Sequence, residues 1–435
     1  MKRFWVFLLA LLFGTFPQKH AADELFLTYS RVTVEDAKSA HDTFIRAVWL
    51  SQFDMQPLYR DGNEQRDEQS FADLMHLMMQ TLVEDGFDTI FLQLRPNGDS
   101  MYDSEVFPLS KYVAGMYGGE ISYDVVQIVV DTARAYNLSV HGWINPLRLV
   151  TVEEMEQVPT GYAVRDWYDR KNGYVKEYGG RLYLDPSYAE VRELIASGAG
   201  EILDRYNLDG IHMDDYFYPT TDASFDTAEF ASSEFEHLGD FRRDNINRLV
   251  ALLYDTAHAC GAVFGISPAG NLDSLADGYY ADAKLWCGTA GYIDYILPQL
   301  YFGFANKYCP FDVMVNRWAE TVTSKSVSLY IGLSAAKAVL GSQGELDAFA
   351  GTDAGQREWI EHKDILSRSL QVIFEDERVE GYCFFSYSYL YDRFTGEVAE
   401  GMEEEYEGLQ ALLTNGKLFC DGTVSKANYL TFVRE

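Results

Sequence analysis

Eight short apolar runs alternate with helical segments along most of this chain, and this alternation limits its fold more than any other feature. Most of the runs are nearly continuous in β-branched and aromatic residues, as expected for strands covered on both faces. Repeated strand–helix alternation predicts an α/β fold, a (β/α)8 TIM barrel, more readily than an open parallel sheet. The predicted strands are Ile45–Leu50, Thr89–Leu94, Ser139–Trp143, Gly210–Met213, Val263–Ser267, Tyr295–Leu300, Ser328–Leu333 and Gly381–Phe385.

Amphipathic segments occupy the intervals between these runs, with apolar residues recurring at helical spacing. Asp185-Pro186 precedes one of them and predicts a helix start, with Asp185 as the N-cap and Pro186 at the first helical position. The predicted helices are Ser70–Glu84, Tyr123–Tyr136, Ser187–Tyr206, Phe241–Ala259, Val313–Ser324 and Arg357–Phe374.

Long polar loops follow the second, third and fourth predicted strands, so we expect long loops at the C-terminal face of the strands. In the third loop, Gly179-Gly180 separates Tyr174–Tyr178 from Leu182–Leu184, which predicts an inserted β-hairpin. The barrel is expected to span residues 45–400, and residues 401–435 to form the last helix and a tail.

Polar side chains stand at the ends of five consecutive predicted strands, where a β/α barrel gathers its functional groups. A single polar strand end would mean little, but five together predict a polar cleft. In strand order the residues are Gln93, Arg95 and Asp99, then Trp143, Asn145 and Arg148, then His212, Asp214, Asp215 and Tyr216, then Ser267 and Asn271, and finally Gln299 and Tyr301.

Asp214 and Asp215 are the strongest candidates for chemistry in this cleft. Side chains alternate between the two faces of a strand, so His212 and Asp214 share one face and Asp214 is expected to project into the barrel mouth. Asp215, at the bend, would reach the cleft rim or hold a neighbour. Carboxylates flanked by aromatic rings suit a sugar-cleaving site, although an Asp in such a loop also often caps the next helix.

The basic residues of the cleft allow two interpretations. Arg95 and Arg148 could hold Asp214 ionised or bind substrate carboxylates, or they could simply pair with buried aspartates. His212 is expected to be a hydrogen-bonding wall residue rather than a metal ligand, because no second His lies at a metal-binding spacing. Ser51-Gln52-Phe53-Asp54 after the first strand is no dinucleotide-binding loop, so neither a metal nor another cofactor is expected.

The composition restricts the partners of the protein. The formal net charge of −32 argues against nucleic acid and against an anionic membrane surface. Aromatic residues make up 15% of the chain, with 30 Tyr and 7 Trp, a content that suits surfaces that stack on sugars. The composition therefore favours a glycan as the binding partner.

The N-terminus resembles an export signal. Lys2 and Arg3 precede an apolar run over residues 4–16, which is of signal-peptide length and short for a transmembrane helix. We therefore expect residues 1–22 to be a signal peptide or an N-terminal anchor, residues 23–44 a linker, and the protein to be exported to the periplasm, cell envelope or exterior. Lys19 and His20 interrupt the small-residue pattern of a cleavage site, so both fates of the segment stay open.

An ordered series of motifs runs along most of the predicted barrel. The motifs are Arg46–Leu50, Phe91–Asp99, His141–Arg148, Leu184–Pro186, Asp209–Pro219, Phe241–Arg248, Gly265–Pro268 and Ile293–Tyr301. In this order they resemble the glycosyl hydrolase-like family ten of bacterial envelope proteins. The resemblance covers roughly residues 44 to 330 and continues more loosely to about 400. It implies a barrel enzyme acting on peptidoglycan glycan strands, with a preference for strands that lack stem peptides.

The fourth strand is also similar, more distantly, to the nucleophile motif of the α-amylase superfamily. That motif is Asp-Gly-x-Arg-x-Asp, and Asp209–Asp214 occupies it here with His212 in place of the Arg. The resemblance implies that Asp214 is the nucleophile-like residue. Ser267 stands where that superfamily keeps its acid, so Asp215 is our candidate for the general acid.

Around these two carboxylates, aromatic and amide side chains are expected to bind the sugar. Tyr216, Tyr301 and Trp143 would stack on or hydrogen-bond to the rings, and Asn145, Gln299 and Asn271 would bind hydroxyl or acetamido groups. The sequence leaves retaining, inverting and substrate-assisted hydrolysis open. It also leaves open a barrel that binds envelope glycan without cutting it, and a glycosidase acting on another polysaccharide.

Overall fold

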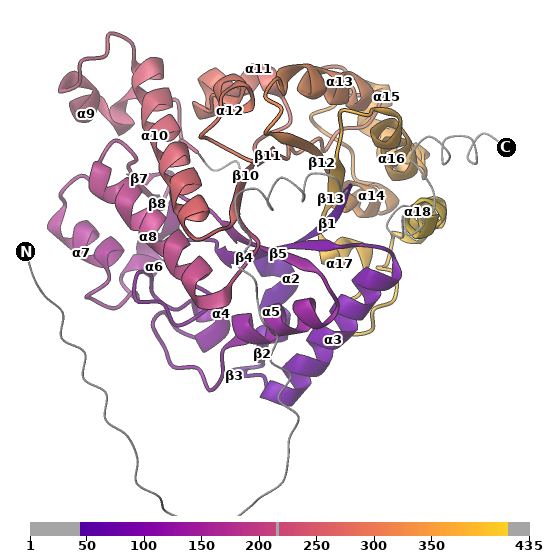
Figure 1. The fold of residues 1–435 in the computed structure, drawn as a ribbon, viewed down its shortest axis with the longest axis horizontal. Helices are drawn as coiled ribbons and strands as arrows, with labels where there is room; N and C mark the ends of the chain where they lie inside the picture. The colour runs from indigo at the N-terminus through magenta and orange to yellow at the C-terminus, as the bar shows by residue number, and fades with distance from the viewer. Residues whose placement is uncertain (1–43, 215–216, 416–435) are drawn as a thin grey trace, which may run out of the picture.

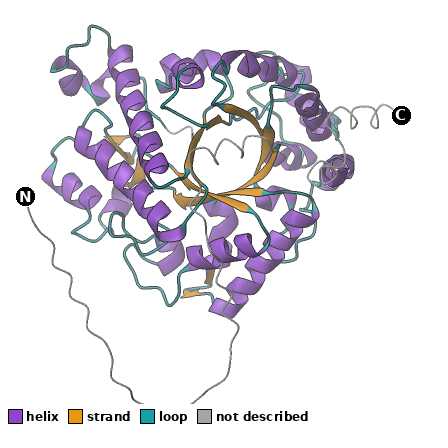
Figure 2. Cartoon of the chain, viewed as in Figure 1, coloured by secondary structure: helices purple, strands orange, loops and turns teal. Residues whose placement is uncertain are grey.

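The computed structural model describes residues 44–214 and 217–415, with side chains described as far as Leu413. Eight parallel strands form a closed barrel, in which the first strand pairs with both the second and the last. Figures 1 and 2 look into this ring of strands and show helices surrounding it. The predicted (β/α)8 barrel is confirmed. Its strands are β1 (Ile45–Leu50), β4 (Thr89–Arg95), β5 (Ser139–Ile144), β9 (Gly210–Asp214), β10 (Val263–Ser267), β11 (Tyr295–Ile296), β12 (Ser328–Ser334) and β13 (Gly381–Phe385).

The eight predicted strands are all present, and only β11 differs much in length. It was expected to run from Tyr295 to Leu300, but the regular strand has two residues. Pro298 has no N–H to donate to a neighbouring strand, which interrupts the ladder. Single bridges from Gln299 to Ala269 and Gly332 continue the pairing beyond the proline.

Helices connect the strands, and the predicted ones are confirmed within a few residues with two exceptions. The segment Arg357–Phe374 forms two helices, because the chain becomes extended at His362. The helices are α2 (Gln52–Tyr59), α3 (Glu68–Glu84), α4 (Lys111–Ala114), α5 (Val125–Ala135), α6 (Val152–Met155), α7 (Ala163–Arg170), α8 (Ala189–Tyr206), α9 (Thr227–Ala231), α10 (Leu238–Ala259), α11 (Leu272–Ser274), α12 (Ala283–Gly288), α13 (Phe311–Thr321), α14 (Ala335–Ser342), α15 (Asp353–Glu361), α16 (Ile365–Glu375), α17 (Tyr387–Leu390) and α18 (Glu403–Asn415).

The second exception is the start of α8, where the prediction that Asp185 is the N-cap was wrong. The N-cap is Tyr188, three residues later. Asp185 instead accepts a hydrogen bond from Ser187 N and pairs with Lys176 at 2.9 Å. The carboxylate therefore ties the start of α8 to the loop that precedes it.

The loop after β5 carries the predicted hairpin as part of a three-stranded sheet. β7 (Val175–Tyr178) and β8 (Arg181–Leu184) are antiparallel, and β6 (Arg148–Thr151) pairs with β8. Gly179 and Gly180 both have positive φ, 61° and 78°, as a two-residue turn of this kind requires. A short hairpin of β2 (Arg60–Asp61) and β3 (Glu64–Gln65) follows α2.

Two layers of apolar side chains hold the barrel together. The larger cluster lies between the strands and the helices, and a smaller aromatic cluster fills the barrel interior. Trp49, Phe91, Trp143 and Tyr295 belong to the interior cluster. They close the barrel beneath its mouth, so polar groups are left at the ends of the strands.

No helix within residues 44–214 and 217–415 combines the length and apolar character needed to cross a membrane. The expected signal segment and residues 23–43 of the expected linker lie outside the described residues, as do the catalytic candidate Asp215 and its neighbour Tyr216.

Candidate active site

Asp214 is the last residue of β9 and lies at the mouth of the barrel. In the neighbouring strand, Ser267 is its register partner at the end of β10. Asp214 is only 2% exposed, and its Oδ2 accepts hydrogen bonds from Trp143 Nε1 at 3.1 Å and from Asn145 Nδ2. Two N–H donors on one oxygen stabilise negative charge there. The predicted inward direction of Asp214 agrees with these contacts.

A chain of amides fixes the direction of the Asn145 donor. Asn145 Oδ1 accepts a hydrogen bond from Gln93 Nε2 at 2.7 Å, and Gln93 Oε1 accepts one from Gln52 N at 2.7 Å. Because Gln93 presents its NH2 group, Asn145 must offer its oxygen to Gln93 and its nitrogen to Asp214. Asn97 Nδ2 extends the chain by donating to Gln52 Oε1 at 3.3 Å. The loops after β1, β4 and β5 are thereby coupled to the carboxylate on β9.

His212 lies one layer deeper on the same face of β9 and forms part of the barrel wall. It is fully buried, and its Nε2 accepts a hydrogen bond from Trp49 Nε1 at 3.1 Å. The proton is therefore on Nδ1, which contacts the hydroxyl of Tyr295 at 3.1 Å. Burial lowers the pKa of His212 well below its ordinary value, so the ring is neutral.

His141 lies on the other side of the same tyrosine. Its Nδ1 is 3.0 Å from Tyr295 OH, which can donate to it while accepting from His212. Burial lowers the pKa of His141 to about 4. Within residues 44–214 and 217–415, no group of three or more His, Cys, Asp or Glu side chains is arranged to hold a metal ion.

Arg95 does not face the mouth, contrary to expectation. Regular alternation would place it on the inner face with Gln93, but a register shift between Gln93 and Arg95 pairs Arg95 with the outward-facing Ile144. The buried guanidinium packs 4.5 Å from the ring centroid of Phe107, and a Cβ on Gly198 of α8 would lie 3.3 Å from Nη1. Burial lowers the pKa of Arg95 to about 10.

Three other candidate side chains make hydrogen bonds to backbone groups of the loops and helix ends. Asp99 is buried, accepts a hydrogen bond from Asn97 N at 3.0 Å, and has a pKa raised by burial. Arg148 Nε donates to Pro96 O at 3.0 Å, so it supports the same loop. Asn271 caps α11, where its side chain accepts from Asp273 N at 3.1 Å. Each of the three side chains thus has a contact that supports a loop or a helix end.

The sixth strand, β11, contributes to the mouth beside β10. Gln299 Nε2 donates to Ser267 O at 3.2 Å, next to the end of β9. Ser267 Oγ is buried and has no hydrogen-bond partner among the described residues. Tyr301 is half-buried and packs edge-on against Trp49, with ring centroids 6.5 Å apart. The structure thus brings together at the C-terminal end of the barrel strands the residues Gln93, Trp143, Asn145, His212, Asp214, Ser267, Gln299 and Tyr301.

Sequence reasoning missed Trp49 and Gln52, which belong to this site through the first strand. The rule applied to strands two to six, namely to read the residues at and just past each strand end, would have found both. Asp54 follows them, and its carboxylate accepts hydrogen bonds from Ser386 Oγ at 2.9 Å and Ser388 N at 2.8 Å. It joins the loops after the first and last strands.

Asp214 differs from the other buried carboxylates of the described chain. Each of the others binds backbone N–H groups, hydroxyl groups or a basic side chain that belong to a helix end or loop. Asp214 accepts hydrogen bonds from the side-chain N–H groups of Trp143 and Asn145, which stand at the barrel mouth. The others are Asp54, Asp85, Asp99, Asp185, Asp226, Asp347, Glu358 and Glu405.

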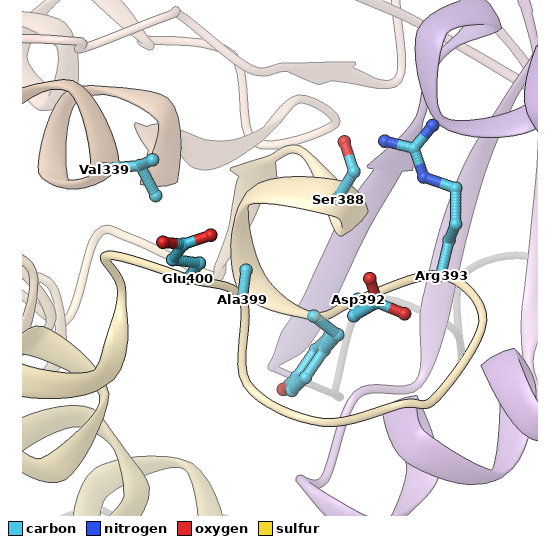
Figure 3. A pocket seen from close by; sticks show the side chains of 7 residues that line it. Val339, Ser388, Asp392, Arg393, Ala399 and Glu400 are labelled. Atoms are coloured by element: carbon cyan, nitrogen blue, oxygen red, sulfur yellow. The ribbon is translucent and has the colours of Figure 1, made fainter. Parts of the chain in front are cut away.

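A separate cavity of about 180 Å³ lies beside α14 and α17 (Figure 3). Arg393 and Asp392 line it, but both take part in folding the loop: Arg393 Nη1 donates to Phe53 O at 3.1 Å, and Asp392 Oδ1 accepts from Phe394 N at 2.8 Å. None of the predicted site residues lines this cavity.

The model of the family described as glycosyl hydrolase-like 10 matches residues 44–346. The chain belongs to this family. It is 30% identical over 328 residues to glycosyl hydrolase YngK of Bacillus subtilis, covering 69% of this chain and 62% of that protein. It is 32% identical over 281 residues to glycosyl hydrolase DigH of Escherichia coli K12, covering 57% and 62%. The chain thus matches less than two thirds of the length of these relatives.

Solved structures confirm the fold. The glycoside hydrolase domain of PgaB from Bordetella bronchiseptica superposes with a TM-score of 0.51 at 11% identity, covering 85% of this chain and 99% of that domain. The catalytic domain of β-amylase from Paenibacillus polymyxa gives the same TM-score and identity, covering 86% and 98%. At this identity the similarity concerns the barrel architecture only.

Proposed function

We propose that this protein is a glycoside hydrolase that cleaves N-acetylated glycan, specifically the glycan strands of peptidoglycan, with Asp214 and Asp215 as its catalytic carboxylates. The observation that carries the proposal is Asp214 itself, a buried carboxylate at a barrel mouth that accepts hydrogen bonds from the side chains of Trp143 and Asn145. Membership in a glycosyl hydrolase-like family supports the same reaction class.

The hydrogen bonds to Asp214 suit a role in its ionised form. Donors on Oδ2 stabilise the carboxylate, which can then attack the anomeric carbon, activate water or orient the acetamido group of the substrate. A general acid has to be protonated at the start of the reaction, so a different group must protonate the leaving oxygen. We assign that role to Asp215, and ring stacking to Trp143, Tyr216 and Tyr301.

The separation of the two catalytic carboxyl groups would distinguish the mechanisms. About 5–5.5 Å corresponds to retention through a glycosyl-enzyme, and about 6.5–9.5 Å to inversion by a water molecule. In the substrate-assisted route, the acetamido oxygen is the nucleophile and Asp214 supports the charge that develops on the acetamido group. Anomeric configuration of the first product, followed by NMR, separates inversion from the other two.

The test is mass spectrometry of products from purified glycan strands, with and without stem peptides, incubated with wild type or Asp214→Asn. New reducing ends from wild type only would support the reaction and identify the bond that is cut. Binding without products from either protein would favour a glycan-binding barrel. Neither binding nor products would redirect the search to another polysaccharide.

We also propose that the protein is exported, on the basis of Lys2, Arg3 and the apolar residues 4–16. Cell fractionation with N-terminal sequencing of the recovered protein tests this. Recovery only from the cytoplasmic fraction would contradict it.

A further inference from the structure

A group of exposed apolar side chains stands on two neighbouring loops beside the barrel mouth. Phe349 is 86% exposed, Tyr308 63% and Leu346 52%. We call Tyr308, Leu346 and Phe349, together with Lys307, the rim platform. Leaving a large apolar side chain in water forgoes the free energy gained when it is buried. A group of such side chains on one surface therefore indicates a binding site for a partner.

The rim platform lies on the same side of the barrel as Asp214. Residues 301–310 connect the end of β11 to α13, and in a β/α barrel such loops lie at the carboxyl ends of the strands. The loop begins at Tyr301, which contacts Trp49 and Phe385 at the top of the barrel interior. It therefore runs outward from the mouth, and the platform is a distal part of the same face.

The two loops are held against each other by a backbone hydrogen bond. Lys307 N donates to Ala350 O at 2.9 Å. Tyr308 and Phe349 are the chain neighbours of these two residues, so the hydrogen bond holds the two aromatic residues close to each other. The buried Asn306 side chain accepts from Tyr308 N and Cys309 N, both at 3.0 Å. The exposure of the rings is thus a property of an ordered loop.

Further contacts fix both loops to the scaffold. The buried Glu358 accepts from Phe304 N at 3.0 Å and Ala305 N at 2.8 Å, and Lys337 pairs with Asp347 at 2.6 Å. Gly351 has a φ of +81°, and a Cβ there would lie 2.5 Å from the Tyr308 ring. Because the ring lies over this glycine, its orientation is set before any ligand binds, which reduces the entropy lost on binding.

A positive charge accompanies the rings. Lys307 Nζ lies 5.3 Å from the centroid of the Tyr308 ring. The exposed Lys307 has no ion pair with another described residue, although the chain as a whole is strongly acidic. The rim platform therefore presents flat apolar surface and a cation together.

We propose that the rim platform is a distal subsite for a glycan strand that carries carboxylate groups. The apolar face of a pyranose ring stacks on Tyr308 or Phe349, and a carboxylate of the strand binds Lys307. This inference rests on the proposed function, since it takes the same glycan as ligand. It adds that the protein holds long strands at a point remote from the bond it cuts.

The experiment uses Asp214→Asn as the background, so that binding is measured without cleavage. Glycan strands freed of stem peptides are compared with short oligosaccharides of the same composition by calorimetry. The pair Tyr308→Ala and Phe349→Ala should weaken binding of long strands about tenfold and leave short oligosaccharides unchanged. Tyr308→Phe keeps the ring and should bind like its parent.

A second arm tests the charge. Lys307→Gln should weaken binding of native strands, and this loss should disappear with strands whose carboxyl groups have been reduced to alcohols. Lys307→Arg keeps the charge and serves as the matched control. Equal affinity of Lys307→Gln and its parent for native strands would overturn the assignment of the cation.

The outcomes separate this inference from the proposed function. Cleavage of long strands by wild type, with unchanged affinity after removal of both rings, would overturn the subsite and leave the glycosidase standing. An equal loss for long and short ligands would overturn its distal position. Unchanged glycan affinity with self-association that depends on Phe349 would assign the platform to a second copy of the chain. Absence of both cleavage and glycan binding by wild type would remove the proposed function and the subsite together.

Discussion

Asp214 and Glu405 are equally buried carboxylates in two regions of the barrel, and they differ in the groups that hold them. Both are 2% exposed, and both accept two N–H donors. The donors to Glu405 are Ile365 N at 3.0 Å and Leu366 N at 3.2 Å, in the first turn of α16. Backbone groups of a helix end need a partner whatever the protein does, whereas Trp143 and Asn145 side chains at a barrel mouth serve the carboxylate. Burial alone therefore does not distinguish these two carboxylates, but the kind of donor does.

The largest effect should come from Asp214→Asn, which removes the charge and keeps the shape. Turnover of glycan strands should fall at least about a thousandfold, because the proposed catalytic carboxylate is lost. Thermal unfolding should change little, since the amide can still accept from Trp143 or Asn145. The check is kcat on one substrate batch, with Glu405→Gln as a matched carboxylate-to-amide control. A similar loss of kcat in both variants would contradict the proposal that Asp214 is catalytic and Glu405 structural.

Asn145→Ala should have the second largest effect. It removes one donor to Asp214 and leaves the Gln93 amide without its partner, so kcat should fall about ten- to a hundredfold. Gln93→Leu, one step further from the carboxylate, should lose less. Both are measured with folded protein at saturating substrate. If Asn145→Ala lowers the melting temperature but leaves kcat unchanged, then the Asp214–Asn145 contact contributes to stability only, as the Glu405 contacts do.

The strands and their order were predictable from the sequence because barrel strands are buried on both faces and read as continuous apolar runs. The inward direction of Asp214 followed from strand alternation. Arg95 was expected at the mouth because it stands at a strand end. One extra residue in the ladder between Gln93 and Arg95 turns its side chain to the outer face, and no residue type marks that shift. Asn271 illustrates another difficulty. Short polar side chains satisfy nearby backbone N–H groups, and a polar residue past a strand end looks the same in sequence whether it does so or binds a ligand. Asp185 also accepts from a nearby backbone N–H group, that of Ser187, but the helix that it was predicted to cap begins later.

Glu405→Ala should affect stability and leave catalysis intact. The substitution leaves Ile365 N and Leu366 N without their buried acceptor. This lowers the free energy of unfolding by about 1–3 kcal/mol. The exposed neighbour Glu404→Ala is the matched control and should change it by less than about 0.5 kcal/mol. Chemical denaturation measures both, and kcat per folded molecule should equal that of wild type. A fall in that kcat would contradict the structural role.

The last prediction concerns how the stability of the fold depends on pH. Burial raises the pKa of Glu405 from its ordinary 4.5 to about 7 in the folded protein. A carboxyl group that binds its proton more tightly when folded stabilises the fold fully below its unfolded pKa, and this contribution is lost as the pH rises toward 7. Glu405→Gln does not titrate, so its free energy of unfolding should fall less than that of wild type between pH 4.5 and 7, by about 1–3 kcal/mol. Other groups also titrate between these pH values. One is Asp88, because burial raises its pKa to about 6. These groups are present in both proteins, so their contributions cancel when the two free energies of unfolding are subtracted.

Parallel curves of stability against pH for the two proteins would show that Glu405 is ionised at low pH after all. The backbone donors of α16 would then stabilise its charge as Trp143 and Asn145 stabilise that of Asp214.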